Sequence, residues 1–307
     1  MHKIYLPTIQ QMKLFESVAR LKSMTRAAEE VSLTQPSVSM QIRSMEEKIG
    51  LPLIEQIGKQ LYLTRAGEEV LATCQDVLAR LAAMKSNLAH LDNEIAGVLS
   101  LGVVSSAKYV LPQIIGEFKR AFPRVEPRVT LANREEIIRR IQSNRDDLYV
   151  MGTPPEQSAL VSTEFLDNEI VFVATPYHPL ASQKTLTLKQ IVQADIISRE
   201  RGSGTRSAIE RRLAGENLRL IPHMEFEDSE AIKLAALSGL GIAYVSLHAM
   251  RLELAARELV ILDVADFPLR RKWYVMHHQA KQLTPVATRF REFLLASGQR
   301  GSDPQMG

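Results

Sequence analysis

The stretch Leu33-Thr34-Gln35-Pro36-Ser37-Val38-Ser39-Met40-Gln41-Ile42 decides how the start of this chain folds. Thr34 or Gln35 can cap a helix, and Pro36 suits the first helical turn, where its missing N–H costs nothing. Gly50 ends the pattern. We therefore predict a helix over 35–49 with a small polar N-terminus and one buried face. The apolar residues of that face are Val38, Ile42, Met45 and Ile49.

A second, shorter helix is expected immediately before this one. Ala27, Ala28 and Val31 lie on one face of it, and Thr25 can serve as its N-cap. A capped helix, a short turn and a second helix form a helix-turn-helix, which can enter the major groove of DNA. The spacing alone also allows a three-helix bundle used for protein contact.

Within this helix-turn-helix, base reading and phosphate binding fall to different side chains. Gln35 pairs a donor with an acceptor and can address a base edge, preferably that of adenine. Ser39 and Gln41 can reach a base or a phosphate, and basic groups suit phosphate oxygens. The predicted DNA-binding residues are Thr25, Thr34, Gln35, Pro36, Ser37, Ser39, Met40, Gln41, Arg43, Lys59 and Arg65.

The charge of the chain is unevenly distributed. The 307 residues carry a net charge of +3, and residues 1–65 alone hold nine Lys or Arg against six Glu. The rest of the chain is balanced, so the excess positive charge lies in the N-terminal segment. It favours an anionic partner there, although this excess is a weak signal by itself.

Other bulk properties exclude several classes of protein. No apolar run reaches the roughly 18 residues that a membrane span needs, and no apolar segment of a signal peptide precedes Pro7. The single cysteine, Cys74, excludes an internal disulfide framework and a cysteine-based metal cluster. We therefore expect a cytoplasmic protein of two or three domains with no membrane partner.

A small hairpin and a long helix follow the helix-turn-helix. Extended runs at 53–54 and 61–63, joined through 58–60, predict a wing. From Thr64 onward, apolar residues alternate at spacings of four and three, which is the heptad pattern of a coiled coil. These residues are Val70, Cys74, Val77, Leu81, Met84, Leu88 and Leu91. We expect this helix to pair with its counterpart in a second subunit; the alternative is a core helix of one large domain.

Strands alternate with helices from residue 97 onward, which predicts two α/β, Rossmann-like lobes with largely parallel sheets and a cleft between them. The expected domains are an all-α winged helix-turn-helix at 1–63, a linker helix at 64–92, an effector-binding domain at 93–297 and a tail at 298–307. Lobe I takes 97–164 and 268–297, and lobe II takes 165–267. The chain is expected to cross between the lobes near 162–168 and 264–270.

The cleft is expected to bind a small anion. Gly202-Ser203-Gly204-Thr205 precedes a helix and exposes backbone N–H groups at its positive end, as does Ser105-Ser106. Basic side chains such as Arg134 can add charge. The predicted effector-binding residues are Ser105, Ser106, Lys108, Asn133, Gly152, Thr153, Arg199, Gly202, Ser203, Gly204, Thr205, Arg206, Ser229, Glu230 and Ser246. The alternative is that these loops only cap helices and that the basic residues are solvated.

Patterns typical of hydrolases and metalloenzymes are missing from the sequence. It contains neither His-Glu-x-x-His nor Gly-x-Ser-x-Gly, and the glycine-rich segment at 202–205 lacks the Gly-Lys-Ser/Thr ending of a Walker loop. His277 and His278 are neighbours in an expected strand and so point to opposite faces. We expect no enzymatic activity, no metal site and no cofactor beyond a small-molecule effector.

Three N-terminal segments resemble the LysR-type transcriptional regulators. They are Met24-Thr25-Arg26-Ala27-Ala28-Glu29, the opening stretch, and Leu63-Thr64-Arg65-Ala66-Gly67-Glu68. The resemblance extends to about residue 297. It implies a winged helix-turn-helix on double-stranded promoter DNA, a homodimer through the linker helix, and a two-lobed effector domain similar to type II periplasmic binding proteins. It also implies a homotetramer, contact with RNA polymerase, and DNA bending that an effector in the cleft alters.

Four segments of the effector half are similar to the CbbR branch of that family: 102–109, 151–156, 199–206, and 230–233 followed by 239–248. The branch regulates Calvin-cycle carbon-fixation operons. The resemblance implies an activator of carbon-fixation genes that responds to a phosphorylated metabolite or NADPH. The alternative is a LysR-type regulator of another metabolic operon, and a more distant one is a solute-binding protein or an enzyme that uses the cleft.

Three features of the sequence depart from the commoner pattern of these relatives. Met40 stands where many members carry a basic residue, and Gln56 replaces the arginine of a Leu-Phe-Glu-Arg wing. A shallower salt dependence of DNA binding is expected from the lost arginine. Asp228-Ser229 replaces a pair of serine or asparagine residues, which bears on the ligand chemistry of the cleft.

Overall fold

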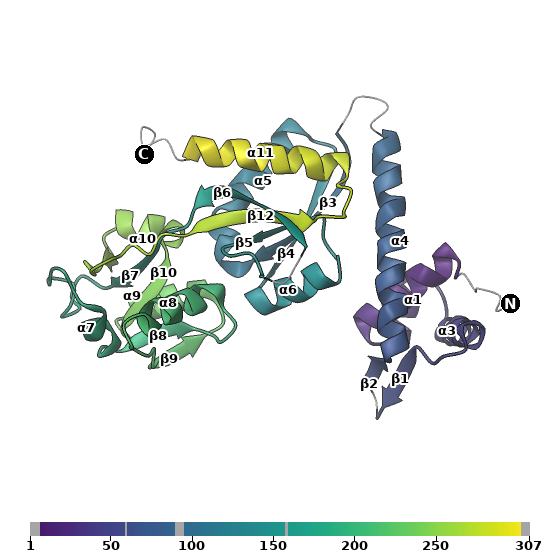
Figure 1. The fold of residues 1–307 in the computed structure, drawn as a ribbon, viewed down its shortest axis with the longest axis horizontal. Coiled ribbons are helices and arrows are strands. Elements are labelled where there is room, and N and C mark those ends of the chain that lie inside the picture. Colours follow the sequence, from purple (N-terminus) through teal and green to yellow (C-terminus); the bar gives the residue numbers. More distant parts are fainter. Residues whose placement is uncertain (1–6, 59, 90–94, 157–158, 302–307) are drawn as a thin grey trace. The chain divides into compact units, whose positions relative to one another are not determined.

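The computed structural model describes residues 7–58, 60–89, 95–156 and 159–301, except for the side chains of 82, 83, 85–89 and 299–301. The chain divides into two compact units, Met1–Asp92 with Ser143–Arg145, and Asn93–Gln142 with Asp146–Gly307. The first unit holds three short helices, a hairpin and a long helix, and the second holds two α/β lobes (Figure 1). In the described part of the chain, no helix is both long and apolar enough to span a membrane.

The first unit begins with the predicted helix-turn-helix. Its elements are α1 (Ile9–Leu21), α2 (Met24–Glu30), α3 (Gln35–Ile49), and a hairpin of β1 (Ile54–Ile57) with β2 (Gln60–Leu63). Phe15, Val38 and Met45 are fully buried where the three helices meet. Burial of large apolar side chains at about 1.5–3 kcal/mol each holds this small domain together.

The ends of the helices follow the expected capping chemistry with one exception. The Thr34 hydroxyl accepts the backbone N–H of Ser37 at 3.4 Å, and Gly50 ends α3 with a left-handed φ of 79°. The prediction that Thr25 caps α2 is wrong. Ser23 is the cap, accepting from the backbone N–H of Arg26 at 3.3 Å, because α2 starts earlier than its apolar pattern indicates.

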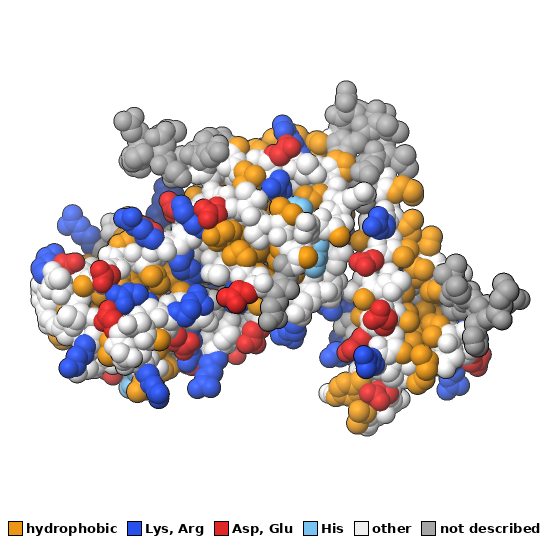
Figure 2. Space-filling model, viewed as in Figure 1, with side chains coloured by type: hydrophobic (Ala, Val, Ile, Leu, Met, Phe, Trp, Pro, Cys, Tyr) orange, Lys and Arg blue, Asp and Glu red, His pale blue; other side chains and the backbone are white. Residues whose placement is uncertain are grey.

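The long helix α4 (Arg65–Ala89) is preceded by Thr64, whose hydroxyl accepts the backbone N–H of Gly67 at 3.0 Å. Val70 and Cys74 pack into the core of the helix-turn-helix, so α1 of the same chain covers the first part of the predicted seam. Met84, farther along, is 53% exposed, and hydrophobic side chains gather along α4 (Figure 2). The Leu88 side chain and all of Leu91 lie outside the described residues.

Lobe I is a five-stranded sheet in the order β4-β3-β5-β12-β6. Its strands are β3 (Gly97–Val104), β4 (Val125–Ala132), β5 (Leu148–Met151), β6 (Leu160–Asp167) and β12 (Lys272–His278). Its helices are the 3-10 helix η2 (Ser105–Tyr109), α5 (Leu111–Ala121), α6 (Arg134–Gln142) and α11 (Pro285–Gly301). Trp273 and Tyr149 are buried in its core, and the rings of Phe118 and Phe290 meet edge-on at 5.0 Å.

Lobe II is a second five-stranded sheet, in the order β11-β7-β10-β8-β9. Its strands are β7 (Ile170–Ala174), β8 (Ile196–Arg199), β9 (Met224–Phe226), β10 (Ile242–Ser246) and β11 (Val260–Ile261). Its helices are α7 (Leu188–Val192), α8 (Gly204–Ala214), α9 (Ser229–Leu237), η3 (Leu247–Met250) and α10 (Arg251–Ala255). Phe172 and Val173 point into cores on opposite faces of β7, so both faces of this sheet are covered.

One strand in each sheet, β12 in lobe I and β7 in lobe II, runs antiparallel to its neighbours, so the sheets are less parallel than expected. The chain leaves lobe I through β6 and returns through β12, which pairs antiparallel with both β5 and β6. Residues 160–167 therefore form an edge strand rather than a crossing. The crossings lie just beyond, where the backbone N–H of Asn168 donates to Arg271 at 2.8 Å and Ile170 bridges to Leu269.

Candidate functional site

The N-terminal end of α3 presents the side chains predicted to read DNA. Gln35, Pro36 and Met40 are exposed, and Ser39 and Gln41 are half-buried beside them. The Thr34 and Ser37 hydroxyls lie 2.8 Å apart at the helix start. In the described part of the chain the Gln35 amide makes no side-chain hydrogen bond, so its donor and its acceptor remain available to a ligand.

The residues expected at phosphate oxygens are spread over the same unit. Thr25, Arg43 and Arg65 are exposed, and Lys59 lies outside the described residues. Gln56, which replaces an arginine of related sequences, bends back within the hairpin. Its Nε2 donates to the Gly58 carbonyl at 3.0 Å. The Gln56 side chain is therefore held at the tip of the wing.

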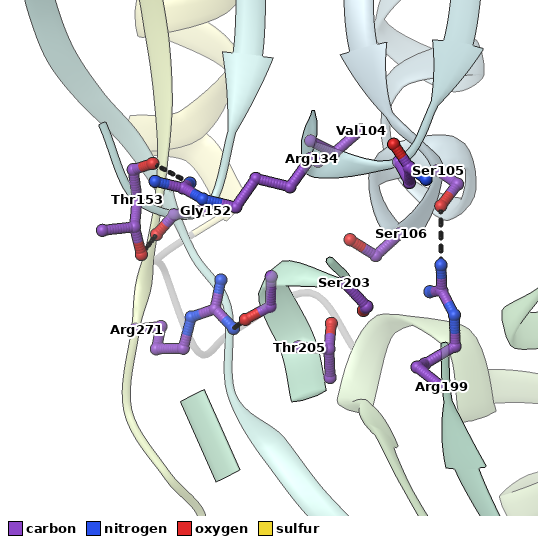
Figure 3. A pocket seen from close by; sticks show the side chains of 12 residues that line it. Val104, Ser105, Ser106, Arg134, Gly152, Thr153, Arg199, Ser203, Thr205 and Arg271 are labelled. Carbon is purple, nitrogen blue, oxygen red and sulfur yellow. Dashed lines mark hydrogen bonds between the residues drawn. The ribbon is translucent and has the colours of Figure 1, made fainter. Parts of the chain in front are cut away.

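A pocket of about 320 Å³ lies in the second unit, between the two lobes (Figure 3). Both lobes contribute to its wall, and nine of the predicted effector-binding residues line it. Its lining residues are Val104, Ser105, Ser106, Asn133, Arg134, Gly152, Thr153, Arg199, Ser203, Gly204, Thr205 and Arg271. Most of these lining side chains are polar or charged, which suits a small polar metabolite.

One side of the pocket presents neutral hydrogen-bond donors (Figure 3). Ser203 and Thr205, at the start of α8, are only 2% and 8% exposed. Neither hydroxyl has a hydrogen-bond partner among the described residues. Ser106 faces them from η2 across the pocket. The first turn of α8 adds free backbone N–H groups and the positive end of the helix dipole, which together favour an anion.

The other side of the pocket is cationic. Arg134, at the start of α6, donates to the Thr153 carbonyl, and Arg271, just before β12, donates to the Gly204 carbonyl at 3.2 Å. The Arg271 Nε is buried without a partner, and no described carboxylate forms an ion pair with either arginine. Burial, with Arg211 and Arg134 nearby, lowers the pKa of Arg271 to about 10. Burial and Arg211 also lower the pKa of Arg134. Glu156 opposes this lowering of the pKa of Arg134, whereas no carboxylate does so for Arg271, and both groups stay charged at neutral pH.

Gly152 makes room for this cationic side. A Cβ at residue 152 would overlap Nη2 of Arg271, so only glycine lets the guanidinium lie where it does. Gly152 is among the predicted effector-binding residues, whereas Arg271 is not. Arg271 stands in a basic run at 270–272, and nothing in that run distinguishes the arginine that turns inward.

Two arginines predicted to bind the effector are already neutralised. Arg199 is buried and paired with buried Glu200, with Nε to Oε2 at 2.7 Å, and it also donates to Ser105 and Ser229. Arg206 does not line the pocket, because it pairs with Glu210 at 2.8 Å and with Glu225. Arg199 therefore acts on the pocket chiefly by holding the Ser105 hydroxyl.

The remaining predicted residues lie outside the pocket lining. Lys108 of lobe I forms an ion pair with Asp228 of lobe II. Glu230 of lobe II accepts a hydrogen bond from the Tyr109 hydroxyl of lobe I. Ser229 is held by Arg199, and the Ser246 hydroxyl donates to Asn168 at 2.9 Å. Gly202 lies close to the Glu135 side chain of the opposite lobe. Of the described residues, no three His, Cys, Asp or Glu side chains form a cluster that suits a metal ion.

Comparison with protein families agrees with this arrangement. Residues 9–68 match the family of bacterial regulatory helix-turn-helix proteins of the LysR type, and residues 92–299 match the LysR substrate binding domain. The chain belongs to the LysR family of bacterial transcriptional regulators. Its first unit thus carries a DNA-binding helix-turn-helix, and its two lobes form the family's substrate-binding domain.

Individual LysR-family proteins are similar over nearly the whole chain. The RuBisCO operon transcriptional regulator of Acidithiobacillus ferrooxidans is 40% identical over 296 residues, which cover 96% of each protein. The transcriptional activator CmpR of Synechocystis is 38% identical over 97% of this chain and 98% of CmpR. The solved regulatory domain of Synechocystis CcmR, in complex with 2-PG, is 37% identical with a TM-score of 0.64, and the match covers 66% of this chain and 98% of that domain. These relatives are named as regulators, not as enzymes.

Proposed function

We propose that this LysR-family protein regulates carbon-fixation genes in response to a small phosphorylated metabolite bound in the pocket between its lobes. The observation that carries the proposal is the pocket itself. It combines unpartnered hydroxyls with two arginines that lack carboxylate partners, in a domain 37% identical to one solved with 2-PG. Relatives at 38–40% identity regulate the RuBisCO operon or carry the name CmpR, which supports carbon-fixation genes as the target.

A small phosphorylated carboxylate is the favoured effector. Its two anionic groups match the hydroxyl donors and the arginines that line the pocket. Ser105, Ser106, Asn133, Thr153, Ser203, Gly204 and Thr205 supply the uncharged contacts in this proposal. Lys108, Arg206, Ser229, Glu230 and Ser246 act indirectly, through other residues.

For DNA binding, Gln35, Ser39 and Gln41 are proposed to read bases, and Arg43, Lys59 and Arg65 to bind phosphates. The remaining residues at the start of α3 position it in the groove. The half-buried Val77 and Leu81 and the exposed Met84 of α4 support a dimer through this helix. A homotetramer, contact with RNA polymerase and a cytoplasmic location follow from the family as part of the same proposal.

A footprint on the promoter that adjoins the gene of this protein tests the proposal. The full-length chain is expected to protect a specific site, and 2-phosphoglycolate is expected to change the pattern of protected and hypersensitive bases. NADPH and a sugar bisphosphate serve as parallel arms, since a change with NADPH alone would contradict the favoured effector. Absence of protection at any carbon-fixation promoter would overturn the proposed function.

A further inference from the structure

Met40 is an apolar side chain on the exposed, largely polar surface of α3. It is 66% exposed, more than any other large apolar side chain described in the first unit. Val38, Ile42 and Met45 of the same helix are buried in the core, whereas Met40 does not pack against that core. The fold of the first unit therefore makes no use of the Met40 side chain.

The neighbours of Met40 on this surface direct it towards DNA. Pro36 lies one turn earlier on the same face of α3 and Arg43 one turn later, and both are exposed. Arg43 forms no ion pair with a residue that the structure describes, so its charge is available to a phosphate. A helical side chain leans towards the N-terminus of its helix, so Met40 covers the turn that begins at Pro36. That turn is the part of a recognition helix that contacts base edges.

The chemistry of a methionine side chain limits what it can contact in DNA. It carries no charge and no hydrogen-bond donor, so it cannot neutralise a phosphate, and its thioether is only a weak acceptor. The major groove offers one apolar group, the 5-methyl group of thymine. Contact with that methyl group removes apolar surface of both partners from water. Contact with a polar base edge would instead desolvate a donor or an acceptor without replacing its hydrogen bond.

We propose that Met40 is a specificity-determining residue of the DNA-binding surface and contacts the 5-methyl group of a thymine in the operator. The flexible, unbranched side chain of methionine suits such a contact, because it adapts to the shape of its partner. This inference rests on the proposal that the start of α3 reads bases. Beyond positioning the helix, Met40 then contributes a contact that depends on a single methyl group.

Deoxyuridine tests the contact directly, because it lacks only the 5-methyl group of thymidine and keeps the base pair. The duplex is the site that the full-length chain protects at the promoter adjoining its gene, with each thymine replaced in turn. Fluorescence titration measures the affinity. Native protein is expected to bind about threefold to fivefold less tightly when the contacted thymine is replaced, which is the change for one buried methyl group. Unchanged affinity at every replaced thymine would overturn the proposal.

Variants then assign the sensitive thymine to Met40. Met40→Ala is expected to bind the unmodified duplex about threefold to fivefold less tightly than native protein and to lose no further affinity when that thymine is replaced. Met40→Leu keeps an apolar side chain of similar volume, so it is expected to retain the sensitivity to deoxyuridine. Leu51→Ala, at an apolar residue just beyond α3 that is 54% exposed, is the matched control and is expected to behave as native protein does.

The outcomes separate Met40 from the rest of the DNA-binding surface. If Met40→Ala stays as sensitive to deoxyuridine as native protein, another side chain contacts the methyl group and the proposal is wrong. An equal loss of affinity of Met40→Ala for an unrelated duplex also contradicts it, because the contact would then be nonspecific. Met40 is exposed, so its truncation leaves the core intact, and thermal melting verifies that each variant is folded. If the chain protects its promoter but responds to no deoxyuridine, this inference fails while the proposed function stands.

Discussion

The phenol of Tyr109 donates a hydrogen bond of 2.7 Å to Glu230, joining η2 of lobe I to the first turn of α9 in lobe II. Beside it, Lys108 Nζ lies 2.5 Å from Asp228 Oδ1. We call these four residues the interlobe clasp. The clasp lies next to Ser105 and Ser106 in sequence, so any movement of η2 reaches the pocket directly. Its strength therefore contributes to how far the lobes open when the ligand leaves.

Loss of the Tyr109 hydroxyl is expected to loosen the clasp. Tyr109→Phe removes one hydrogen bond to a carboxylate, which contributes about 1 kcal/mol at a partly exposed site. Because the ligand then has to close a more open pair of lobes, its affinity is expected to fall about threefold to tenfold. Titration with 2-phosphoglycolate measures the change. Tyr177→Phe, at a tyrosine that is 94% exposed, is the control, and equal affinities of the two variants would show that the clasp does not govern closure.

The clasp is expected to depend on pH through its carboxylates. Burial opposes ionisation of Asp228, but the bond from Lys108 outweighs it and lowers its pKa below the ordinary 3.8. For Glu230, burial is likewise outweighed by bonds from Lys233 and Tyr109, which lower its pKa below 4.5. A lowered pKa in the folded state means that the stabilisation is complete above the ordinary values and is lost as the pH falls through the lowered ones.

The variant Asp228→Asn tests how the stability of the clasp depends on pH. The variant is expected to melt a few degrees below the native protein at pH 7, since the Asp228 side chain is 48% exposed and its ion pair is worth at most about 1 kcal/mol. The difference is expected to shrink as the pH is lowered from 5 to 3. If the two melting temperatures differ by the same amount at pH 5 and at pH 3, ionisation of Asp228 is excluded as the cause.

Much of the fold was predictable because hydrophobic spacing and end signals agree along most of the chain. Pro36, Gly50 and Val38 fix the start, end and buried face of α3 from sequence alone. The edge strand β6 was missed, because residues 160–167 are mostly half exposed and owe their structure to pairing with β12, more than 100 residues later. Distant pairing of this kind leaves no local signal in the chain.

The pocket was predictable only in part, for a similar reason. Ser203 and Thr205 follow a glycine-rich turn at a helix start, which is a local pattern with a known physical use. Lys108 and Arg206 look equally suited to an anion in the sequence, yet each is paired with a carboxylate of lobe II. Arg271 is the reverse case. That its buried guanidinium has no carboxylate partner is seen only in the folded structure, where the segment before β12 lies against the start of α8.

Removal of Arg271 is expected to stabilise the unliganded protein. The free guanidinium is desolvated and repelled by Arg134 and Arg211, so its charge opposes folding at neutral pH. Arg271→Gln is therefore expected to raise the free energy of unfolding by about 1 kcal/mol while it weakens the ligand, as is common where a site is built for binding. Denaturant unfolding without ligand measures this change in the free energy of unfolding, with Arg270→Gln as the control. A destabilised Arg271→Gln would mean that its bond to Gly204 outweighs the repulsion.

Gln35 and Arg43 are expected to affect DNA binding in different ways. Gln35→Ala removes a side chain placed to read a base and is expected to cost about 1–3 kcal/mol at the operator and little on unrelated DNA. Arg43→Gln removes a phosphate contact and is expected to weaken both kinds of DNA to a similar extent. Gel-shift titrations on operator and random duplexes distinguish the two. Equal losses on both duplexes in Gln35→Ala would place Gln35 on the backbone instead of a base.

Gln56 in the wing stands where an arginine is common in related sequences. Its amide bonds to the Gly58 carbonyl at 3.0 Å and carries no charge, so it releases no counterion when DNA binds. Gln56→Arg is expected to steepen the dependence of log affinity on log salt concentration by about 0.9 for one added phosphate contact. Fluorescence titration of the operator at several salt concentrations measures the slope. Identical slopes for native protein and Gln56→Arg would mean that residue 56 of the wing does not reach DNA.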